Sequence, residues 1–334
     1  MPTILEPESL YPDTLLEQRI LGPGVRILQG NAKASLTELP EALCAEVEGL
    51  MTLRLPVPEE ALARFPRLRV VVRMGVGYDK VDRAACARRG ITVCNVPDYG
   101  TQEVADTAVT LAAALRRGIP LYHDAMRAEP PCAWGVIPNR IVRRFEVQCF
   151  GILGLGRIGT AAALRAKALG FRVAFFDPHL PNGVDRALGI ERKESLEALL
   201  EVSDVLSLHT PLTRRTRGLI GAAELARLPE GAVVVNTARG PILDLDALEA
   251  GLRSGRIAGA GLDVLPQEPP VPEPPLLRAY RAGEAWLRGR LVILPHIAFH
   301  SPEAWEDIRR KSAETMRDVL LRGLSTNVIP PEAE

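Results

Sequence analysis

The chain of 334 residues is longer than one hydrophobic core usually serves, so we expect two domains of ordinary size. Its 47% hydrophobic and 25% charged residues are typical of globular proteins and exclude a disordered chain. Lysine plus arginine and aspartate plus glutamate number 41 each, so no overall charge attracts a polyanion, and we expect neither nucleic acid nor a membrane as partner.

The cellular location is predicted from the absence of sequence patterns for a membrane span, a signal peptide and paired cysteines. The apolar stretches are far shorter than the roughly 20 residues that a bilayer span needs. The first residues, MPTILEPESLYPD, have neither the basic nor the apolar region of a signal peptide. The five cysteines are scattered without a C-x-x-C pair, which favours reduced, buried thiols over a metal site. We therefore expect a soluble, cytoplasmic protein that holds no metal.

Up to Pro97, short apolar runs alternate with segments of helical spacing. Strands are predicted at residues 25–28, 49–52, 70–73 and 91–94, and helices at 36–44, 59–65 and 81–89. Because strands that alternate with helices form parallel sheets, this part predicts one βα domain. Residues 101–117 then form a predicted long helix that we expect to link two domains, since acidic residues lie near its start and arginines at its end.

A second series of elements follows that helix. Strands are predicted at residues 148–153, 171–177, 205–209, 232–236, 258–264 and 291–294, and helices at 161–169, 195–202 and 245–254. This alternation predicts a doubly wound sheet of about six strands. The proline-rich stretch 268–275 is predicted as a loop, because proline fits neither a helix interior nor a central strand. Residues 302–322 again have helical spacing.

The run GILGLGRIG, which ends at Gly159, lies between a predicted apolar strand and an alanine-rich helix. In this G-x-G-x-x-G pattern Gly154 permits a tight turn, Gly156 lets a pyrophosphate approach, and Gly159 lets the helix pack close to the strand. The first N–H groups of the helix, at Arg157 and Ile158, would bind the phosphates. The alternative is a glycine-rich turn that binds no ligand.

Asp177 lies at the end of the next predicted strand, where a carboxylate can bind both hydroxyls of a ribose. The same carboxylate would repel a 2′-phosphate. No arginine follows it directly, since Pro178 and His179 come next. These features predict NAD rather than NADP as the cofactor.

Three further segments follow predicted strands, at the edge where open α/β sheets bind ligands. They carry Arg239, Glu268 and His296. Hydride transfer to a 2-oxo acid needs these groups: an arginine that binds the substrate oxygens, a histidine that delivers a proton, and a carboxylate that keeps the imidazole protonated. Taken singly, the three residues could also be a surface charge, a loop residue and a turn cap.

At these residues the sequence resembles the D-isomer-specific 2-hydroxyacid dehydrogenases, over nearly the whole chain. The resemblance includes the RMGVGYD turn at residues 73–79 and the Asn-Val-Pro segment at 95–97. Residues 154–159, 164–171 and 236–240 are most similar to the C-terminal-binding-protein branch, which includes NAD-regulated transcriptional corepressors.

The resemblance implies an α/β fold of two Rossmann-like or flavodoxin-like domains, whose parallel sheets flank a cleft. Residues 1–99 and 300–334 would form a discontinuous substrate domain, and residues 100–299 the NAD-binding domain. It also implies that Arg239 binds the substrate, that Glu268 is the partner of the histidine, and that His296 is the general acid/base. It further implies that the N–H groups of Val76 and Gly77 bind the substrate. The residues implied to contact the cofactor are Val104, Thr210, Pro211 and Asp263.

Some features depart from the pattern of the family. Phe299 and His300 stand where the corepressor-like branch usually has Trp-Tyr, so the resemblance does not predict the pocket for the substrate side chain. The segment 269–295 is longer than expected and would cover the cleft or contact a partner. His209 matches no catalytic role and is expected to be structural or to line the cofactor site.

These observations predict a cytoplasmic, NAD-dependent oxidoreductase that interconverts a small 2-oxo acid and its (R)-2-hydroxy acid. Residues 121–144 are longer than a simple connection requires and are predicted to form the interface of a homodimer. The alternative function is an NAD(H)-sensing module that recruits a partner protein, because corepressor-like members retain the same three residues.

Overall fold

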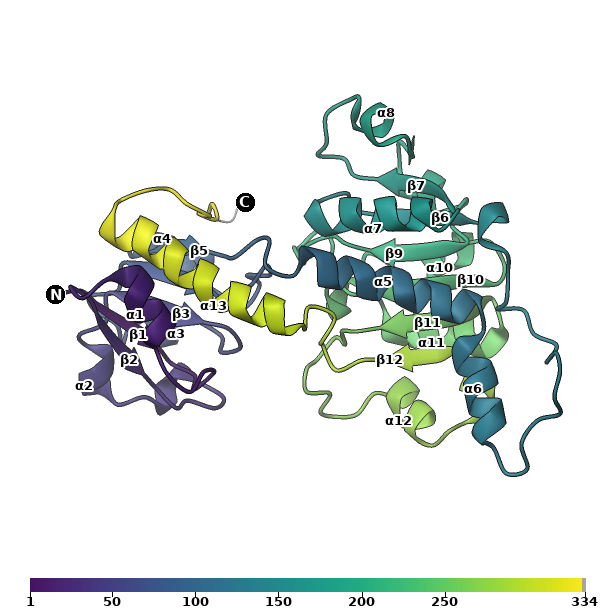
Figure 1. The fold of residues 1–334 in the computed structure, drawn as a ribbon, viewed down its shortest axis with the longest axis horizontal. Helices are drawn as coiled ribbons and strands as arrows, with labels where there is room; N and C mark the ends of the chain where they lie inside the picture. The colour runs from purple at the N-terminus through teal and green to yellow at the C-terminus, as the bar shows by residue number, and fades with distance from the viewer. Residues whose placement is uncertain (332–334) are drawn as a thin grey trace. The chain divides into compact units, whose positions relative to one another are not determined.

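In a computed structural model of the protein, which describes residues 1–331, the chain divides into two compact units. Unit 1 comprises Met1–Tyr99 together with the described residues from Ser301 onward, and unit 2 comprises Gly100–His300 (Figure 1). Within residues 1–331, no helix combines the length and the apolar character that a membrane span requires.

Unit 1 contains a parallel five-stranded sheet with the strand order β2-β1-β3-β4-β5. Its strands are β1 (Thr3–Glu6), β2 (Arg26–Gln29), β3 (Gly49–Thr52), β4 (Val70–Arg73) and β5 (Thr92–Cys94). The four strands that the sequence predicts here are confirmed to within one residue. The first strand, β1, was not among the predicted elements, because only two of its four residues are apolar, which is too short a run to indicate a strand.

Helices cover both faces of the unit 1 sheet. On one face α1 (Leu15–Leu21) packs against α13 (Pro302–Met316), which continues as the π-helical turn η5 (Arg317–Leu321). The other face carries η1 (Leu36–Glu38), α2 (Glu41–Cys44), α3 (Glu59–Leu62) and α4 (Arg83–Arg88). The predicted helix at 36–44 is wrong as a single element, because Pro40 holds the preceding residue extended and separates η1 from α2.

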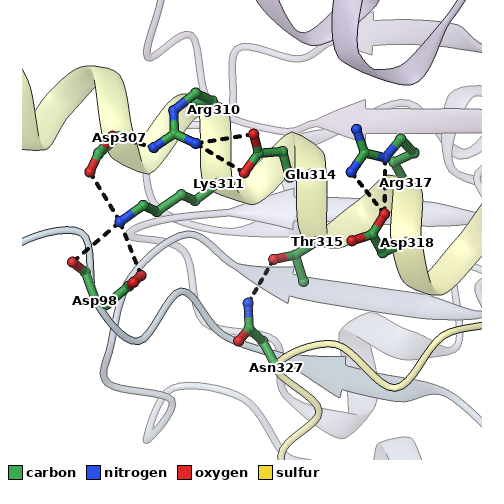
Figure 2. A network of polar contacts seen from close by, with 9 residues as sticks. All are labelled: Asp98, Asp307, Arg310, Lys311, Glu314, Thr315, Arg317, Asp318 and Asn327. Carbon is green, nitrogen blue, oxygen red and sulfur yellow. Dashed lines mark hydrogen bonds and ion pairs between the residues drawn. The ribbon is translucent and has the colours of Figure 1, made fainter.

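Helix α13 ties the end of the chain to the first segment of unit 1 (Figure 2). The ammonium group of Lys311 lies 3.2 Å from Asp98 and 3.0 Å from Asp307. The Asn327 amide donates to the Thr315 hydroxyl at 3.0 Å. The Lys311–Asp98 ion pair joins residues that lie far apart in the sequence, so it links the two segments of unit 1, whereas the other two contacts lie within the second segment.

Unit 2 contains a parallel seven-stranded sheet with the strand order β12-β11-β10-β9-β6-β7-β8. Its strands are β6 (Cys149–Leu153), β7 (Arg172–Phe176), β8 (Glu191–Arg192), β9 (Val205–Leu208), β10 (Ala232–Asn236), β11 (Ile257–Leu262) and β12 (Leu291–Ile293). The six predicted strands are confirmed, and β8 adds a two-residue edge strand too short to show a period. The chain order reverses between β6 and β9, and ligands bind open α/β sheets at the carboxyl ends of such a pair.

Helices cover both faces of this sheet as well (Figure 1). One face carries α5 (Thr101–Arg116), α7 (Arg157–Ala168) and α8 (Val184–Leu188), with α6 (Ile119–Arg127) after α5. The other carries α9 (Leu196–Leu200), α10 (Ala222–Arg227), α11 (Leu245–Ser254), α12 (Pro275–Arg281) and η4 (Ala285–Leu287). Short 3₁₀ turns are η2 (Phe145–Val147) and η3 (Gly240–Ile242). Helix α5 packs on α7, β10 and β11, so it belongs to unit 2 and is not a free linker.

The long segment 269–295 completes the core of unit 2. After a loop that agrees with the predicted one, Pro275 begins α12, and Leu276, Leu277 and Leu287 are buried. Its apolar side chains are therefore used inside unit 2, while a role at a cleft or toward a partner stays a prediction.

The cysteines are unpaired thiols, as the sequence predicts. Cys44, Cys86, Cys94 and Cys149 are buried, and burial raises the pKa of each, so these thiols are neutral at pH 7.

Candidate active site

The glycine turn lies where β6 meets α7, and its glycines are needed for different reasons. Gly154 has a φ of +91°, and a Cβ there would lie 2.9 Å from Cγ2 of Thr210. A Cβ on Gly159 would collide with the carbonyl oxygen of Gly154. At Gly156, in contrast, no heavy atom lies within 4 Å of such a Cβ. The turn is therefore tight on its inner side and open at Gly156, where a pyrophosphate needs room.

The residues around this turn fit NAD. Arg157 and Ile158 are the first two residues of α7, whose N–H groups have no carbonyl acceptor within the helix. Thr210 and Pro211 follow β9, the strand next to β6, and the buried hydroxyl of Thr210 has no hydrogen-bond partner in the structure. An unpaired buried hydroxyl beside an open phosphate turn is the kind of group that a bound dinucleotide satisfies.

Asp177 directly follows β7 and is held beside the glycine turn. Its Oδ2 accepts the N–H of Leu155 and its Oδ1 accepts the N–H of His179, each at 2.9 Å. A carboxylate has about four acceptor positions, so both oxygens can still accept a ribose hydroxyl.

His296 and Glu268 form a direct pair. Nδ1 of His296 lies 2.6 Å from Oε2 of Glu268, whose Oε1 accepts the N–H of Leu265 at 2.9 Å. Because an ionised carboxylate can only accept, Nδ1 carries the proton in this pair, and Nε2 is left to face a substrate. The side chains are 38% and 32% exposed, so the pair is reachable by a small molecule.

The charge of Glu268 is stabilised by its surroundings. Burial alone would raise the pKa of Glu268, but the hydrogen bond and positive charge of His296 outweigh it, with help from the Leu265 N–H and the charge of Arg239. The net effect lowers the pKa of this carboxyl group, so it is ionised at neutral pH.

The backbone at His296 is strained. Its φ is +58°, a left-handed conformation that residues other than glycine adopt at a cost of about 1–3 kcal/mol. Asp263, which is 2% exposed, holds this conformation: its carbonyl accepts the His296 N–H at 2.8 Å, and its carboxylate accepts the N–H groups of Ile297 (2.8 Å) and Ala298 (3.0 Å). The structure thus gives Asp263 a positioning role that the sequence did not reveal, and its contact with the nicotinamide stays a prediction.

Arg239 lies at the end of the turn that follows β10. The buried side chain of Asn236 fixes this turn, because its oxygen accepts the N–H of Ala238 and its amide donates to the Arg239 carbonyl, both at 3.0 Å. A Cβ on Gly240 would collide with the backbone of Leu265, so this turn lies directly against the one that carries Glu268. Unit 2 therefore brings Arg239, Glu268 and His296 together. Sequence reasoning gave Asn236 no role, although it begins the segment 236–240 that carries the resemblance.

The remaining predicted residues are distributed over both units. Val104 lies in the first turn of α5, and the hydroxyl of Thr107 on the same helix donates to the Ala298 carbonyl at 3.2 Å, so this end of α5 lies beside the His296 turn. Val76 and Gly77 follow β4 in unit 1, and the Asn95 amide donates to the Val76 carbonyl at 2.7 Å. Their contact with a substrate stays a prediction.

His209 lies at the end of β9, next to the glycine turn. Removal from solvent lowers its pKa to about 4, so the imidazole is neutral at pH 7. Its Nε2 lies 2.8 Å from the Ser207 hydroxyl. A polar pocket of about 560 Å³ in unit 2 is lined by residues within 182–194, among them Arg192, and none of the predicted site residues lines it.

Unit 2 is a doubly wound parallel sheet with a phosphate turn after β6 and an acid, Asp177, after β7. Arg239, Glu268 and His296 lie at the carboxyl ends of its strands. This arrangement defines a nucleotide-dependent dehydrogenase. Comparison with known proteins specifies the family. The profile of the "D-isomer specific 2-hydroxyacid dehydrogenase, NAD binding domain" matches residues 109–298. The chain belongs to the D-isomer-specific 2-hydroxyacid dehydrogenases and is an NAD-dependent oxidoreductase.

Individual relatives agree with this assignment. A glyoxylate reductase of Korarchaeum cryptofilum is 37% identical over 279 residues, covering 83% of this chain and 79% of the relative. A D-3-phosphoglycerate dehydrogenase of Methanocaldococcus jannaschii is 32% identical over 275 residues; the match covers 82% of this chain but about half, 49%, of that protein. The structure of an NADPH-dependent glyoxylate/hydroxypyruvate reductase from Sinorhizobium meliloti, in complex with NADP and malonate, superimposes with a TM-score of 0.81 at 29% identity, covering 100% of this chain and 98% of that one. The similarity to the corepressor branch stays a prediction.

Proposed function

We propose that this enzyme reduces a small 2-oxo acid to its (R)-2-hydroxy acid, with His296 as general acid/base, Glu268 as the partner of the histidine and Arg239 as the residue that binds the substrate. The 2.6 Å contact between His296 Nδ1 and Glu268 Oε2 carries the proposal. It leaves Nε2 as the proton donor and keeps a negative charge beside the imidazolium.

Each residue has a distinct part in the mechanism. When bound, NADH supplies the hydride that the C2 atom of the substrate receives. His296 donates its Nε2 proton to the oxygen of the C2 carbonyl, and in the reverse direction it accepts that proton from the hydroxyl. Arg239 stabilises the negative charge that develops on the same oxygen, and Glu268 stabilises the imidazolium before it gives up the proton. Val76 and Gly77 would bind the substrate carboxylate through their N–H groups.

The names of the relatives suggest the first substrates to test. Glyoxylate and hydroxypyruvate come from the names of the two reductases, and pyruvate and longer 2-oxo acids extend the series in size. The experiment is a panel of these acids with NADH, followed by loss of NADH absorbance and by chiral analysis of the product. Turnover to an (R)-2-hydroxy acid supports the proposal. No turnover on any acid, together with NADH-dependent capture of a partner protein, would instead favour the sensing module.

Cofactor preference follows from Asp177. We expect kcat/KM with NADH to exceed that with NADPH by at least about tenfold, because the carboxylate repels a 2′-phosphate. Replacing Asp177 by alanine should narrow this gap, mainly by raising KM for NADH. Measuring both cofactors with one substrate checks the prediction, and equal use of NADH and NADPH by the wild type would show that Asp177 does not select the cofactor.

The homodimer is proposed to use residues 121–144. In this segment several large apolar side chains are exposed, including Trp134 at 95% and Val136 at 88%. A second copy of the chain that covers them would explain why α6 has no buried residue of its own. Light scattering should give the mass of a dimer, and the double substitution Trp134→Ser and Val136→Ser should give the monomer. Leu15→Ser, which removes an apolar side chain that is 71% exposed in unit 1, is the control; a wild-type monomer at micromolar concentration would contradict the proposal.

A cytoplasmic location is part of the same proposal. It is supported by the unpaired state of the five cysteines, which suits a reducing compartment.

A further inference from the structure

Arg192 makes an unusual set of contacts next to Asp177. It belongs to the edge strand β8 and pairs in register with Phe175 of β7. Its Nη1 donates to the carbonyl of Pro181 and its Nη2 to that of Leu180, each at 3.0 Å, and Nη2 also reaches the carbonyl of Asp177 at 3.4 Å. One half-buried guanidinium therefore contacts three carbonyls of the loop 177–181.

This loop has no helix or strand hydrogen bonds of its own, so its shape depends on such contacts. A guanidinium offers five N–H donors in a planar fork, which suits several acceptors at once, and a lysine ammonium on a flexible stem does not. The guanidinium of Arg192 also lies over the Phe175 ring, with Cζ 6.0 Å from its centroid. The ring and the loop carbonyls together hold the guanidinium in place.

The held loop in turn fixes the carboxylate of Asp177. One of the two N–H groups that bind this carboxylate belongs to His179, inside the loop. The other belongs to Leu155 in the glycine turn, outside it. A change in the loop would therefore move one of the two anchors of Asp177 while the second stays in place.

We propose that Arg192 is a positioning residue of the cofactor site: it holds the ribose-binding loop in place, and its positive charge selects for a 2′-phosphate once the carboxylate of Asp177 is removed. The proposal rests on the proposed role of Asp177. In the wild type the carboxylate repels a 2′-phosphate. Without the carboxylate, a fixed guanidinium is left beside the ribose position, with donors beyond the three that the loop carbonyls take.

The residues that directly follow Asp177 in the sequence do not indicate this role of Arg192. Cofactor preference is commonly predicted from whether an arginine directly follows the acid, and Pro178 and His179 occupy those positions here. Arg192 comes from the next strand instead, and β8 pairs with β7 in parallel, so its side chain arrives at the same end of the sheet as Asp177.

The test compares Arg192→Met with Lys193→Met, which removes the same charge from the neighbouring residue, paired with Glu191 at 2.6 Å. Dissociation constants for NADH and NADPH are measured by calorimetry without substrate, so the result does not depend on turnover. Arg192→Met should weaken NADH binding by about tenfold, the loss expected when one charge-assisted hydrogen bond between Asp177 and the ribose is weakened, with kcat at saturating NADH unchanged within about twofold. Lys193→Met should bind NADH as the wild type does. Equal NADH affinity in both variants would overturn the positioning role.

A second arm tests the charge. The single variant Asp177→Ala should bind NADPH more tightly relative to NADH than the wild type does. Adding Arg192→Met to it should remove this gain. Adding Arg192→Lys, which keeps the positive charge, should retain most of the gain. A double Ala/Met variant that still prefers NADPH as strongly as Asp177→Ala would overturn the proposal. If Asp177→Ala alone leaves the ratio of the two affinities unchanged, the proposed role of Asp177 fails, and with it the selection by charge. The first arm still decides whether Arg192 positions the loop, and circular dichroism of each variant confirms that it is folded.

Discussion

Replacing Arg239 by alanine should lower kcat/KM for a 2-oxo acid by about three orders of magnitude, with NADH affinity unchanged. The turn that carries Arg239 is fixed by Asn236 and lies against the turn of Glu268, so the guanidinium sits beside the proton-donating pair. Its charge contributes to lowering the pKa of Glu268, which places it within electrostatic reach of that pair. A positive charge there acts on the substrate oxygen as it becomes negative, and alanine supplies none.

Two variants make this measurement specific. Arg239→Lys keeps the charge but loses the planar pair of donors, so it should recover part of the lost rate. Arg227→Ala removes an arginine that is exposed and paired with Glu201, and it should keep wild-type kinetics. A value for Arg239→Ala within tenfold of wild type would refute its role.

Replacing His296 by asparagine should lower kcat by about 10²–10⁴-fold in both directions, the range that general acid/base catalysis contributes. Asparagine is the suitable replacement because it tolerates the left-handed backbone that φ +58° requires at this position. The variant should therefore fold and bind NADH normally, and lose only the group that carries the proton. Steady-state rates in both directions, with calorimetry of NADH binding, separate these effects.

His123→Asn is the matched control, since His123 is exposed on α6 and the proposal gives it no part in the chemistry. If His296→Asn retained more than a tenth of the wild-type kcat, another group would have to deliver the proton.

The sequence predicted those parts of the fold and site in which a local pattern is sufficient. The backbone of the glycine turn could be predicted from the sequence, because Gly154 and Gly159 must be glycine for reasons local to the turn. Strands with a continuous apolar run were predicted close to their true bounds, whereas β1, with only two apolar residues among its four, and the two-residue β8 were not. In the helix predicted at 36–44, Pro40 outweighed the apolar spacing.

Contacts between distant segments could not be predicted in the same way. Asp263 binds the N–H groups of Ile297 and Ala298, and this contact exists only because β11 and β12 are neighbours in the sheet. The contact of Arg192 with the loop after Asp177 likewise depends on the pairing of β7 with β8. The resemblance predicted Arg239, Glu268 and His296, and the sheet order explains why these three lie together in unit 2.

The pH profile of Glu268→Gln tests the central claim, that Glu268 and His296 act as one proton-transferring pair. The pKa of Glu268 lies below its ordinary value, so its charge is present at neutral pH and favours the proton on His296. Reduction needs that proton, so reductive kcat/KM should fall as pH rises, and oxidative kcat/KM should increase over the same range. Glutamine keeps the shape and removes the charge, so both profiles should shift to lower pH, at a reduced rate. Profiles that coincide with those of the wild type would contradict the pairing.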